Sequence, residues 1–368
     1  MMKILMISHT KAIWTPYFSR FFISRGYKVL VATFSPEPIE GVDTEFVGVK
    51  GYDKLLNKHI FFTKVPMIRH IIRHFKPDLI FAIYFASNGL SAALSWNGPL
   101  VVSAVGSDVL DRNQRTGFRR YFRESVIRFV ARKADIINTV SQELDDELCR
   151  LGVPKSKLLQ IPFGVDTHMF YPAEGTPRES ATKFICTRAH KPLYDIPILI
   201  EALALLKNAG QKFHCTFTSD GPMLGDNKRY AEKVGLQNYV AFTGILEHDK
   251  IPNLLREADI YISASRCDGT SVSLLEAMAT GLFPVVSQIR ANEPWIEHNR
   301  TGLLFEVGHP RSLAEDLQKA MYDKQLRQQA FNENIHIVNR DCNMHYNMER
   351  LSKAFEKLVD RKMPSSRV

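Results

Sequence analysis

The stretch Asp268-Gly-Thr-Ser-Val-Ser-Leu-Leu-Glu276-Ala-Met-Ala-Thr-Gly281, continued by Leu282-Phe-Pro-Val-Val-Ser287, has the pattern of a helix that leads into a buried strand. Residues 272–279 are rich in Leu, Ala and Met, which are good helix formers. Thr270 or Ser271 can cap the start of this helix, and Gly281 can end it in a left-handed turn. Residues 282–287 are apolar enough to form an interior strand.

Asp268 and Glu276 are the only charged residues between Cys267 and Gln288. Glu276 falls in a helix that is apolar nearly all round, so it is expected to be buried and to need a partner. That partner is either structural, such as an Arg or backbone amides, or a ligand hydroxyl. Asp268 precedes the helix, where N–H groups and the helix dipole favour an anion. The two carboxylates could bind hydroxyls on either side of a phosphate, and the spacing fits a structural role equally well.

Length and composition point to two soluble α/β domains. A chain of 368 residues is too long for one ordinary core, and 45% hydrophobic with 24% charged residues is typical of globular proteins. No apolar stretch reaches the roughly 20 residues that span a bilayer, and the first residues resemble a strand rather than a signal peptide. Five scattered cysteines without Cys-x-x-Cys spacing indicate a reducing cytoplasm. No cluster of acids suggests a metal-binding pair, so no metal is expected.

The net charge of +9 lies entirely in the N-terminal half. Residues 1–165 hold 23 Lys/Arg against 14 Asp/Glu, whereas the remainder is balanced. Residues 112–133 contain eight basic residues, one Glu and four aromatic residues. This segment predicts either a surface for anionic membrane or an acidic acceptor, or a solvated helix whose aromatic residues pack on the core. Nucleic acid is not expected, because no recognised binding motif accompanies the charge.

Strand-like and helix-like segments alternate along the chain, which is typical of parallel sheets wrapped by helices. Residues 164–177, with two prolines and two glycines, are the expected hinge between domains. Residues 343–359 predict a helix with one apolar face. The predicted strands are 4–8, 29–34, 79–84, 100–104, 136–140, 184–187, 215–218, 240–243, 260–263 and 285–287, and the clearest other helices are 17–25 and 142–150.

The C-terminal half resembles glycosyltransferase family 4. Besides the opening stretch, in which two acidic residues are separated by seven, motifs match in the family's order over residues 134–310. They are Ala134-Asp-Ile-Ile-Asn-Thr-Val-Ser141; Leu151-Gly-Val-Pro-Lys-Ser-Lys157 with Ile161-Pro-Phe-Gly-Val-Asp166 and Phe170; Thr187-Arg188 with Ile198-Leu-Ile-Glu-Ala-Leu203; Ser219-Asp-Gly-Pro222; Val240-Ala-Phe-Thr-Gly244 with Ala258-Asp-Ile-Tyr-Ile-Ser-Ala-Ser265; and Asn299-Arg-Thr-Gly-Leu-Leu-Phe305.

The resemblance implies a GT-B fold, in which two Rossmann-like domains have parallel sheets that face each other across a cleft. We expect an acceptor-side domain at residues 1–166, a nucleotide-sugar-binding domain at 167–342, and a helix at 343–368 that crosses back to the first domain. The implied activity is transfer of a hexose from a nucleoside diphosphate sugar to an acceptor hydroxyl, with retention, without metal or cofactor, in cell-surface polysaccharide or glycolipid synthesis. UDP or GDP is favoured over ADP as the nucleotide, and the acceptor is a sugar or is lipid-linked. The expected location is the cytoplasm, or the periphery of the inner face of the membrane.

The resemblance also assigns a donor site. Arg188 and the backbone amides at the start of the helix would stabilise the departing diphosphate, because a planar guanidinium suits phosphate. Asp268 would hold sugar hydroxyls, Glu276 ribose hydroxyls, and Gly244 with Ile245 the base. The full set is Arg188, Lys191, Gly221, Gly244, Ile245, Gly269, Thr270, Ser271, Val272, Ser273 and Glu276, and the residues assigned to catalysis are Arg188, Asp268, Glu276 and Asp108.

Alternatives to two of these roles stay open. Arg188 could instead pair with Asp195 or Glu201 on the surface. Gly221 either lets backbone approach a ligand or makes a turn.

The sequence departs from the family's pattern in three places. Where the family has Lys-Gly after its Arg, this chain has Tyr194-Asp195, so Lys191 or Tyr194 would take over the contact with phosphate. No Gly-Gly loop follows the first strand; the sequence there is Ser8-His9-Thr10-Lys11-Ala12. The family's His is absent from Ala104-Val-Gly-Ser-Asp108, which leaves Asp108, or His9, as the candidate for contact with the acceptor.

These departures motivate a second hypothesis, a binding or scaffold subunit that keeps the GT-B fold without catalysis. A phosphorylase with pyridoxal phosphate or a sugar-nucleotide epimerase is a third. A nicotinamide dehydrogenase is not expected, since no Gly-x-Gly-x-x-Gly follows a predicted strand.

Overall fold

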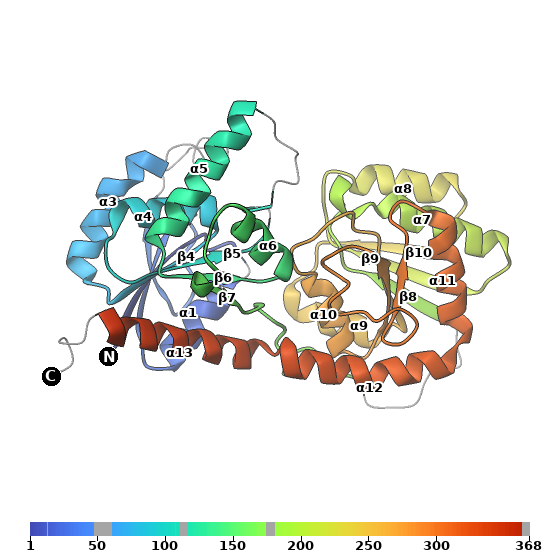
Figure 1. Cartoon of the computed structure of the whole chain (residues 1–368). Helices are drawn as coiled ribbons and strands as arrows, with labels where there is room; N and C mark the ends of the chain where they lie inside the picture. Colours follow the sequence, from blue (N-terminus) through green and yellow to red (C-terminus); the bar gives the residue numbers. More distant parts are fainter. Residues whose placement is uncertain (13, 48–60, 107, 111–116, 174–180, 363–368) are drawn as a thin grey trace. The chain divides into compact units, whose positions relative to one another are not determined.

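The chain folds into two compact α/β units, each built on an all-parallel sheet (Figure 1). The computed structural model describes residues 1–12, 14–47, 61–106, 108–110, 117–173 and 181–362. Unit 1 consists of residues 1–163 together with the chain from Tyr346 onward, and unit 2 of residues 164–345. These boundaries lie three residues from those expected at 166/167 and 342/343.

The seven strands of unit 1 are ordered β3-β2-β1-β4-β5-β6-β7. Helices α3, α4 and α5 lie on one face of this sheet, and α1 and α13 lie on the other (Figure 1). With both faces covered, the central strands are almost wholly buried, which explains their continuous apolar runs. The elements are β1 Lys3–Ser8, α1 Trp14–Ser24, β2 Lys28–Thr33, β3 Asp43–Phe46, α3 Phe61–Phe75, β4 Leu79–Ile83, the π-turn η1 Phe85–Gly89, α4 Leu90–Ser95, β5 Leu100–Ala104, α5 Gly117–Lys133, β6 Ile136–Thr139, α6 Gln142–Arg150, η2 Lys155–Lys157, β7 Leu158–Gln160 and α13 Met344–Lys362.

The six strands of unit 2 are ordered β10-β9-β8-β11-β12-β13. The chain builds outward from β8 through β9 to β10, and then from β11 through β12 to β13 on the other side. The order therefore reverses between β8 and β11. The elements are β8 Thr182–Cys186, η3 Pro192–Tyr194, α7 Ile196–Asn208, β9 Phe213–Thr218, α8 Leu224–Lys233, β10 Val240–Gly244, η4 His248–Lys250, α9 Ile251–Arg256, β11 Ile260–Ser263, α10 Val272–Ala279, β12 Phe283–Ser287, β13 Leu303–Phe305, α11 Pro310–Tyr322 and α12 Lys324–Asp341.

All ten predicted strands are present, within about two residues at their ends. The predicted helices 17–25 and 142–150 correspond to α1 and α6. Three short strands, β3, β7 and β13, were not predicted. Each is an edge strand of its sheet and has only three or four residues, so its sequence is too short for an alternation pattern.

Helix α10 has the predicted bounds, and its end follows the predicted mechanism. Gly281 has φ of +81°, its N–H donates to the carbonyl of Met278 at 3.1 Å, and that of Leu282 donates to Ala277 at 3.0 Å. This is the Schellman pattern of a left-handed helix end. The predicted cap is wrong for Ser271, which stands at the N-cap position without a capping hydrogen bond from its side chain.

The first residues of the expected hinge are fixed to the segment that precedes α13. Val165 N–H donates to the carbonyl of Cys342 at 2.7 Å, and Met344 N–H donates to the carbonyl of Val165 at 2.9 Å. Gly164 has φ of +83°, and a Cβ there would lie 2.4 Å from the Cys342 carbonyl oxygen, so this contact requires glycine. Residues 174–177 of the expected hinge lie outside the described residues.

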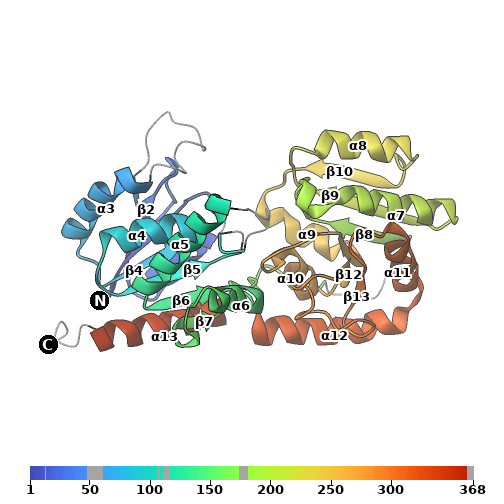
Figure 2. The ribbon, with the colours of Figure 1, turned by 45° about the horizontal axis from the view of Figure 1, so that its top comes forward.

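The apolar face of α13 packs on unit 1, along which it lies in both views (Figures 1 and 2). The Phe355 ring is fully buried, with centroids 5.3 Å from Phe22 and 5.2 Å from Phe81. Polar contacts border this cluster: the hydroxyls of Tyr27 and Ser352 are 2.8 Å apart. The tail helix is therefore part of the core of unit 1.

Replacing Phe355 with Ala is expected to destabilise the protein by about 3–5 kcal/mol, because it leaves a cavity between two buried rings. Urea unfolding followed by circular dichroism measures this loss. Lys353→Ala, at an exposed position of the same helix, is the control and should change stability little. Equal stability of the two variants would contradict the packing described here.

Candidate active site

The strand order of unit 2 brings the predicted donor-site residues together. In open parallel sheets, ligands bind outside the carboxyl ends of the strands where the strand order reverses. In this unit that place lies between β8 and β11. Arg188 follows β8 by two residues, and Asp268 lies in the loop that leads from β11 into α10. Sheet topology alone therefore places the guanidinium beside the start of α10.

Arg188 is buried and held from several sides. It is only 8% exposed, and its Nη1 donates to the Ser273 hydroxyl at 2.8 Å. Its Nη2 forms an ion pair with Asp268, and the guanidinium carbon lies 4.0 Å from the centre of the Tyr194 ring. Burial alone would lower the pKa of Arg188, but the Asp268 carboxylate raises it above its ordinary value. The guanidinium is therefore charged, oriented and matched by one carboxylate.

The alternative in which Arg188 pairs with Asp195 or Glu201 on the surface is wrong. Asp195 pairs with Arg266 at 2.7 Å, and Glu201 accepts a hydrogen bond from the Tyr230 hydroxyl at 2.8 Å. The buried Nε of Arg188 has no hydrogen-bond partner among the described residues. An unmatched charged donor is costly inside a protein, so this atom is a site where an acceptor would be stabilising.

Asp268 is occupied by groups of the protein itself. Besides the ion pair with Arg188, its Oδ1 accepts a hydrogen bond from the Gly269 N–H at 2.9 Å. The predicted contact of Asp268 with sugar hydroxyls therefore requires this carboxylate to be shared or released. In this structure, Asp268 takes the place beside Arg188 that an anionic ligand would need.

The partner of the buried Glu276 is His248. Its Oε1 lies 3.2 Å from Nε2 of His248, which comes from η4, just after β10, and whose ring contacts Phe170 with centroids 5.4 Å apart. The hydrogen bond to Glu276 raises the pKa of His248 above its ordinary value, against the effect of burial, and Asp166 and Asp249 add to the rise. Sequence reasoning missed His248, because a single histidine in a loop after a strand carries no spacing signal.

The other donor-site residues fall at the same edge of the sheet. Gly244 ends β10 with φ of +72°, and Ile245 beside it is largely exposed. Gly221 approaches the backbone of His190, where a Cβ would lie 2.4 Å from the carbonyl oxygen. The Leu224 N–H donates to the Gly221 carbonyl at 3.1 Å, so the glycine begins a turn, as one of the two predicted roles has it, and its approach to a ligand stays a prediction. Gly269, Thr270, Ser271, Val272 and Ser273 form the loop and first turn of α10.

Of the two residues proposed to replace the family's Lys, Tyr194 is the one that contacts Arg188. Its ring covers the guanidinium, whereas the side chain of Lys191 is exposed. Tyr261 was not anticipated from sequence; it is fully buried and its hydroxyl donates to the Ser273 hydroxyl at 2.9 Å. This contact orients the serine that receives the hydrogen bond from Arg188.

Asp108 lies in unit 1, after β5, and its carboxylate joins the loop after β4 to the loop after β5 by hydrogen bonds. Its Oδ2 accepts from the Phe85 N–H at 2.7 Å, and its Oδ1 accepts from Val105 at 3.0 Å and Gly106 at 2.8 Å. Phe85 begins the π-turn η1, just after Tyr84, which has φ of +77°. These contacts give Asp108 a structural role, and its catalytic role stays a prediction.

The described residues contain neither a metal-binding cluster nor a membrane-spanning helix. No group of three or more His, Cys, Asp or Glu side chains could hold a metal ion within the described ranges. None of the helices described here is long and apolar enough to cross a membrane.

Replacing His248 with Asn is expected to cost more stability in acid than in alkali. Because Glu276 raises the pKa of His248 in the folded state, the stabilisation is complete below the unfolded value of about 6.5 and is lost as pH rises through the folded value. The difference in unfolding free energy between wild type and variant should thus be larger at about pH 5.5 than at about pH 8.5, by less than about 1 kcal/mol because the side chain is a third exposed.

Urea titrations at both pH values measure this difference, and His214→Asn, at an exposed position of β9, is the matched control. A variant whose loss of stability is the same at both pH values would show that the pair with Glu276 is not ionic.

Comparison with known proteins identifies the family. A model described as Glycosyl transferases group 1 matches residues 171–337, and one described as Glycosyltransferase Family 4 matches residues 16–169. A sulfoquinovosyl transferase, SQD2, of Arabidopsis thaliana is 27% identical over 84% of this chain and 63% of its own length. An Escherichia coli UDP-Gal:alpha-D-GlcNAc-diphosphoundecaprenol alpha-1,3-galactosyltransferase is 27% identical over 66% of this chain and 65% of its own length. The chain thus spans less than two thirds of these two relatives.

Solved structures share the whole fold. A sucrose-phosphate synthase from Thermosynechococcus elongatus superposes with a TM-score of 0.82 at 16% identity, covering 98% of this chain and 100% of that one. Anabaena HepE in complex with UDP superposes with a TM-score of 0.80 at 17% identity, covering 97% of this chain and 100% of that one. With both family models matched in succession along a GT-B fold of two Rossmann-like units, the chain belongs to the group 1 glycosyltransferases of family 4.

Proposed function

We propose that this protein transfers a sugar from a nucleoside diphosphate sugar to an acceptor hydroxyl, with retention of configuration. The observation that carries the proposal is the buried Arg188 beside the start of α10, which among the described residues has one carboxylate partner and no partner for its Nε. An oriented guanidinium beside a helix N-terminus suits a diphosphate, because both stabilise the negative charge that develops as the bond to the sugar breaks.

The pair of Arg188 with Asp268 would change partners when donor binds. The diphosphate supplies the negative charge that Asp268 supplies in the structure described here. The carboxylate, released from the guanidinium, can then accept hydrogen bonds from hydroxyls of the donor sugar. The Tyr261 hydroxyl holds the Ser273 hydroxyl in position, and Ser273 continues to accept the hydrogen bond from Arg188. The guanidinium would therefore keep its orientation during the exchange.

Glu276 would bind the ribose hydroxyls and His248 would hold it in place. A carboxylate that is buried in an apolar helix needs hydrogen-bond donors, and a ribose diol provides two of them. We propose a UDP-sugar as donor, with the base against the backbone of Gly244 and Ile245. HepE, which has the same fold, was solved with UDP-glucose, and the name of the E. coli relative specifies UDP-Gal.

We propose a sugar or a lipid-linked sugar as acceptor, in cell-surface polysaccharide or glycolipid synthesis, at the cytoplasmic face of the membrane. The relatives support this class by name: one acts on a diphosphoundecaprenol-linked GlcNAc, and another, WcaL of E. coli, is named for colanic acid biosynthesis. Retention is proposed from membership of the family alone.

A scaffold subunit without catalysis is the second candidate. It is favoured by Asp108, whose two oxygens accept hydrogen bonds from backbone amides at the place where the family's catalytic His would act. Donor binding without turnover would distinguish it from the enzyme.

The enzyme is expected to bind UDP in a thermal-shift assay and to hydrolyse or transfer from a UDP-sugar. Arg188→Lys should lower kcat/KM by at least about 10²-fold, because Lys cannot reproduce the two-pronged contact. Glu276→Gln should mainly raise KM for the donor. Glu232→Gln, an exposed position on α8, is the control and should retain activity.

Three outcomes are decisive. Full activity of a folded Glu276→Gln variant would remove this residue from the site. Binding of UDP with no turnover of any sugar nucleotide would favour the scaffold. Binding of no nucleoside diphosphate at all would contradict the enzyme and would also favour the scaffold.

A further inference from the structure

Helix α5 of unit 1 has apolar side chains on two opposite faces. At about 3.6 residues per turn, Ile127, Val130 and Ala131 share one face, and all three are buried. This face packs against α4 and the π-turn η1. The second half of α5 is thereby anchored to the body of unit 1, while its first two turns extend beyond α3 and α4 (Figure 1).

The opposite face of α5 presents three aromatic side chains to solvent. Phe118, Tyr121 and Phe122 are 79%, 68% and 52% exposed. They lie three and four residues apart, so they are neighbours on the helix, and the rings of Phe118 and Phe122 are stacked with centroids 6.3 Å apart. The alternative in which these aromatics pack on the core is therefore wrong. Contiguous exposed aromatic groups mark an interaction surface.

The charge around these aromatics is positive. The one acid of α5, Glu124, is compensated by Arg120 at 3.0 Å and by Arg128 and Arg150, each at 3.1 Å. Further along the helix, Arg132 and Lys133 are exposed.

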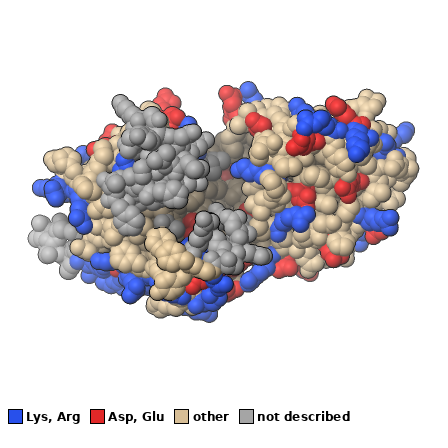
Figure 3. Space-filling view, turned by 90° about the horizontal axis from the view of Figure 1, so that it is seen from above, with Lys and Arg blue, Asp and Glu red and all other residues tan. Residues whose placement is uncertain are grey.

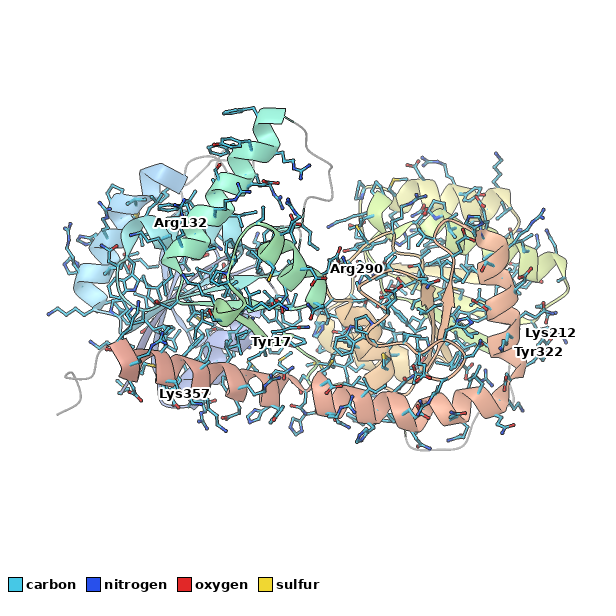
Figure 4. All side chains as sticks on the ribbon, in the orientation of Figure 1. Tyr17, Arg132, Lys212, Arg290, Tyr322 and Lys357 are labelled. Carbon is cyan, nitrogen blue, oxygen red and sulfur yellow. The ribbon has the colours of Figure 1, made fainter. Side chains whose placement is uncertain are left out.

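Figure 4 labels Arg132 on α5. In Figure 3, which looks onto this end of unit 1, atoms of Lys and Arg border uncharged ones at the lower left. Three aromatic rings at the start of α5 are thus followed, about three turns further along the same helix, by two exposed cations, Arg132 and Lys133.

We propose that this face of α5 docks unit 1 on an anionic lipid surface. Aromatic rings prefer the level of the lipid headgroups, where one side is apolar and the other wet, and cations nearby are attracted to anionic lipids. An aromatic side chain buries about 150–250 Å², so three that are 52–79% exposed offer less than the roughly 800 Å² per partner of a stable protein interface. Three rings are enough to insert into a layer of lipid headgroups, because the lipids are fluid and rearrange around the inserted side chains.

This inference stands on unit 1 alone and does not depend on the proposed transfer reaction. Vesicle binding is measured without substrate, so a protein that binds lipid but turns over no sugar nucleotide, or the reverse, separates the two proposals.

The test is co-sedimentation of the full chain with vesicles of phosphatidylcholine, with and without about one third phosphatidylglycerol. Binding is expected only to the anionic vesicles, and it should weaken as salt is raised from about 0.1 M to about 0.5 M. In the variant Phe118→Ser/Tyr121→Ser/Phe122→Ser, binding should weaken at least ~10-fold. Because these side chains are exposed, the variant should fold, and urea unfolding followed by circular dichroism serves as a check.

Two controls match the variants. Tyr171→Ser/Tyr322→Ser removes exposed aromatics from unit 2 and should leave vesicle binding unchanged. Arg132→Gln/Lys133→Gln should weaken binding, whereas Lys228→Gln/Lys233→Gln on α8, with the same loss of charge, should not. Phe122→Trp should show a blue shift of fluorescence, beyond that of the wild type, on addition of anionic vesicles.

Three results would overturn the proposal. They are no binding of the wild type to anionic vesicles, undiminished binding of the triple serine variant, and a dimer of the wild type that the triple variant loses, which would make the surface a contact between two copies.

Discussion

The structure of unit 2 depends on how one buried guanidinium is compensated. Arg188 lies at the reversal of the strand order, and its charge is stabilising there only because Asp268, Ser273 and Tyr194 surround it. The Tyr261 hydroxyl in turn donates a hydrogen bond to the Ser273 hydroxyl. Each of these groups comes from a loop or helix at the carboxyl end of β8 or β11, or from β11 itself, so the sheet and the charge define one site.

Glu276 is likewise a buried ionisable side chain, with a negative instead of a positive charge, and His248 is its partner. The two buried charges thus have partners of the protein's own, and in each case the partner is a group that a nucleoside diphosphate sugar could replace or join. On the proposed function, the unliganded site is held together by contacts that mimic those of the donor. Such a site keeps the guanidinium oriented without substrate, and the rearrangement left for donor binding is the release of Asp268 from Arg188.

Much of the fold could be predicted from sequence, because the interior strands are continuous apolar runs and α10 carries its own stop signal at Gly281. Strands β3, β7 and β13 are too short for a pattern. In the site, resemblance to the family's motifs pointed to Arg188, Asp268 and Glu276, whereas the spacing of the two acids alone left a structural role equally open. Neither could supply His248, since that contact depends on how the loop after β10 folds back. The outward rings of α5 were ambiguous, because a helix with two apolar faces does not indicate which face is buried.

On the proposed function, the Arg188 guanidinium is the group that contacts the donor phosphates. Calorimetric titration of the wild type and an Arg188→Ala variant with UDP and with uridine tests this contact. We expect the variant to bind UDP at least about 10-fold more weakly, through loss of one charge-assisted contact, while any binding of uridine is unchanged. Unchanged affinity for UDP, or an equal loss for UDP and uridine, would contradict it.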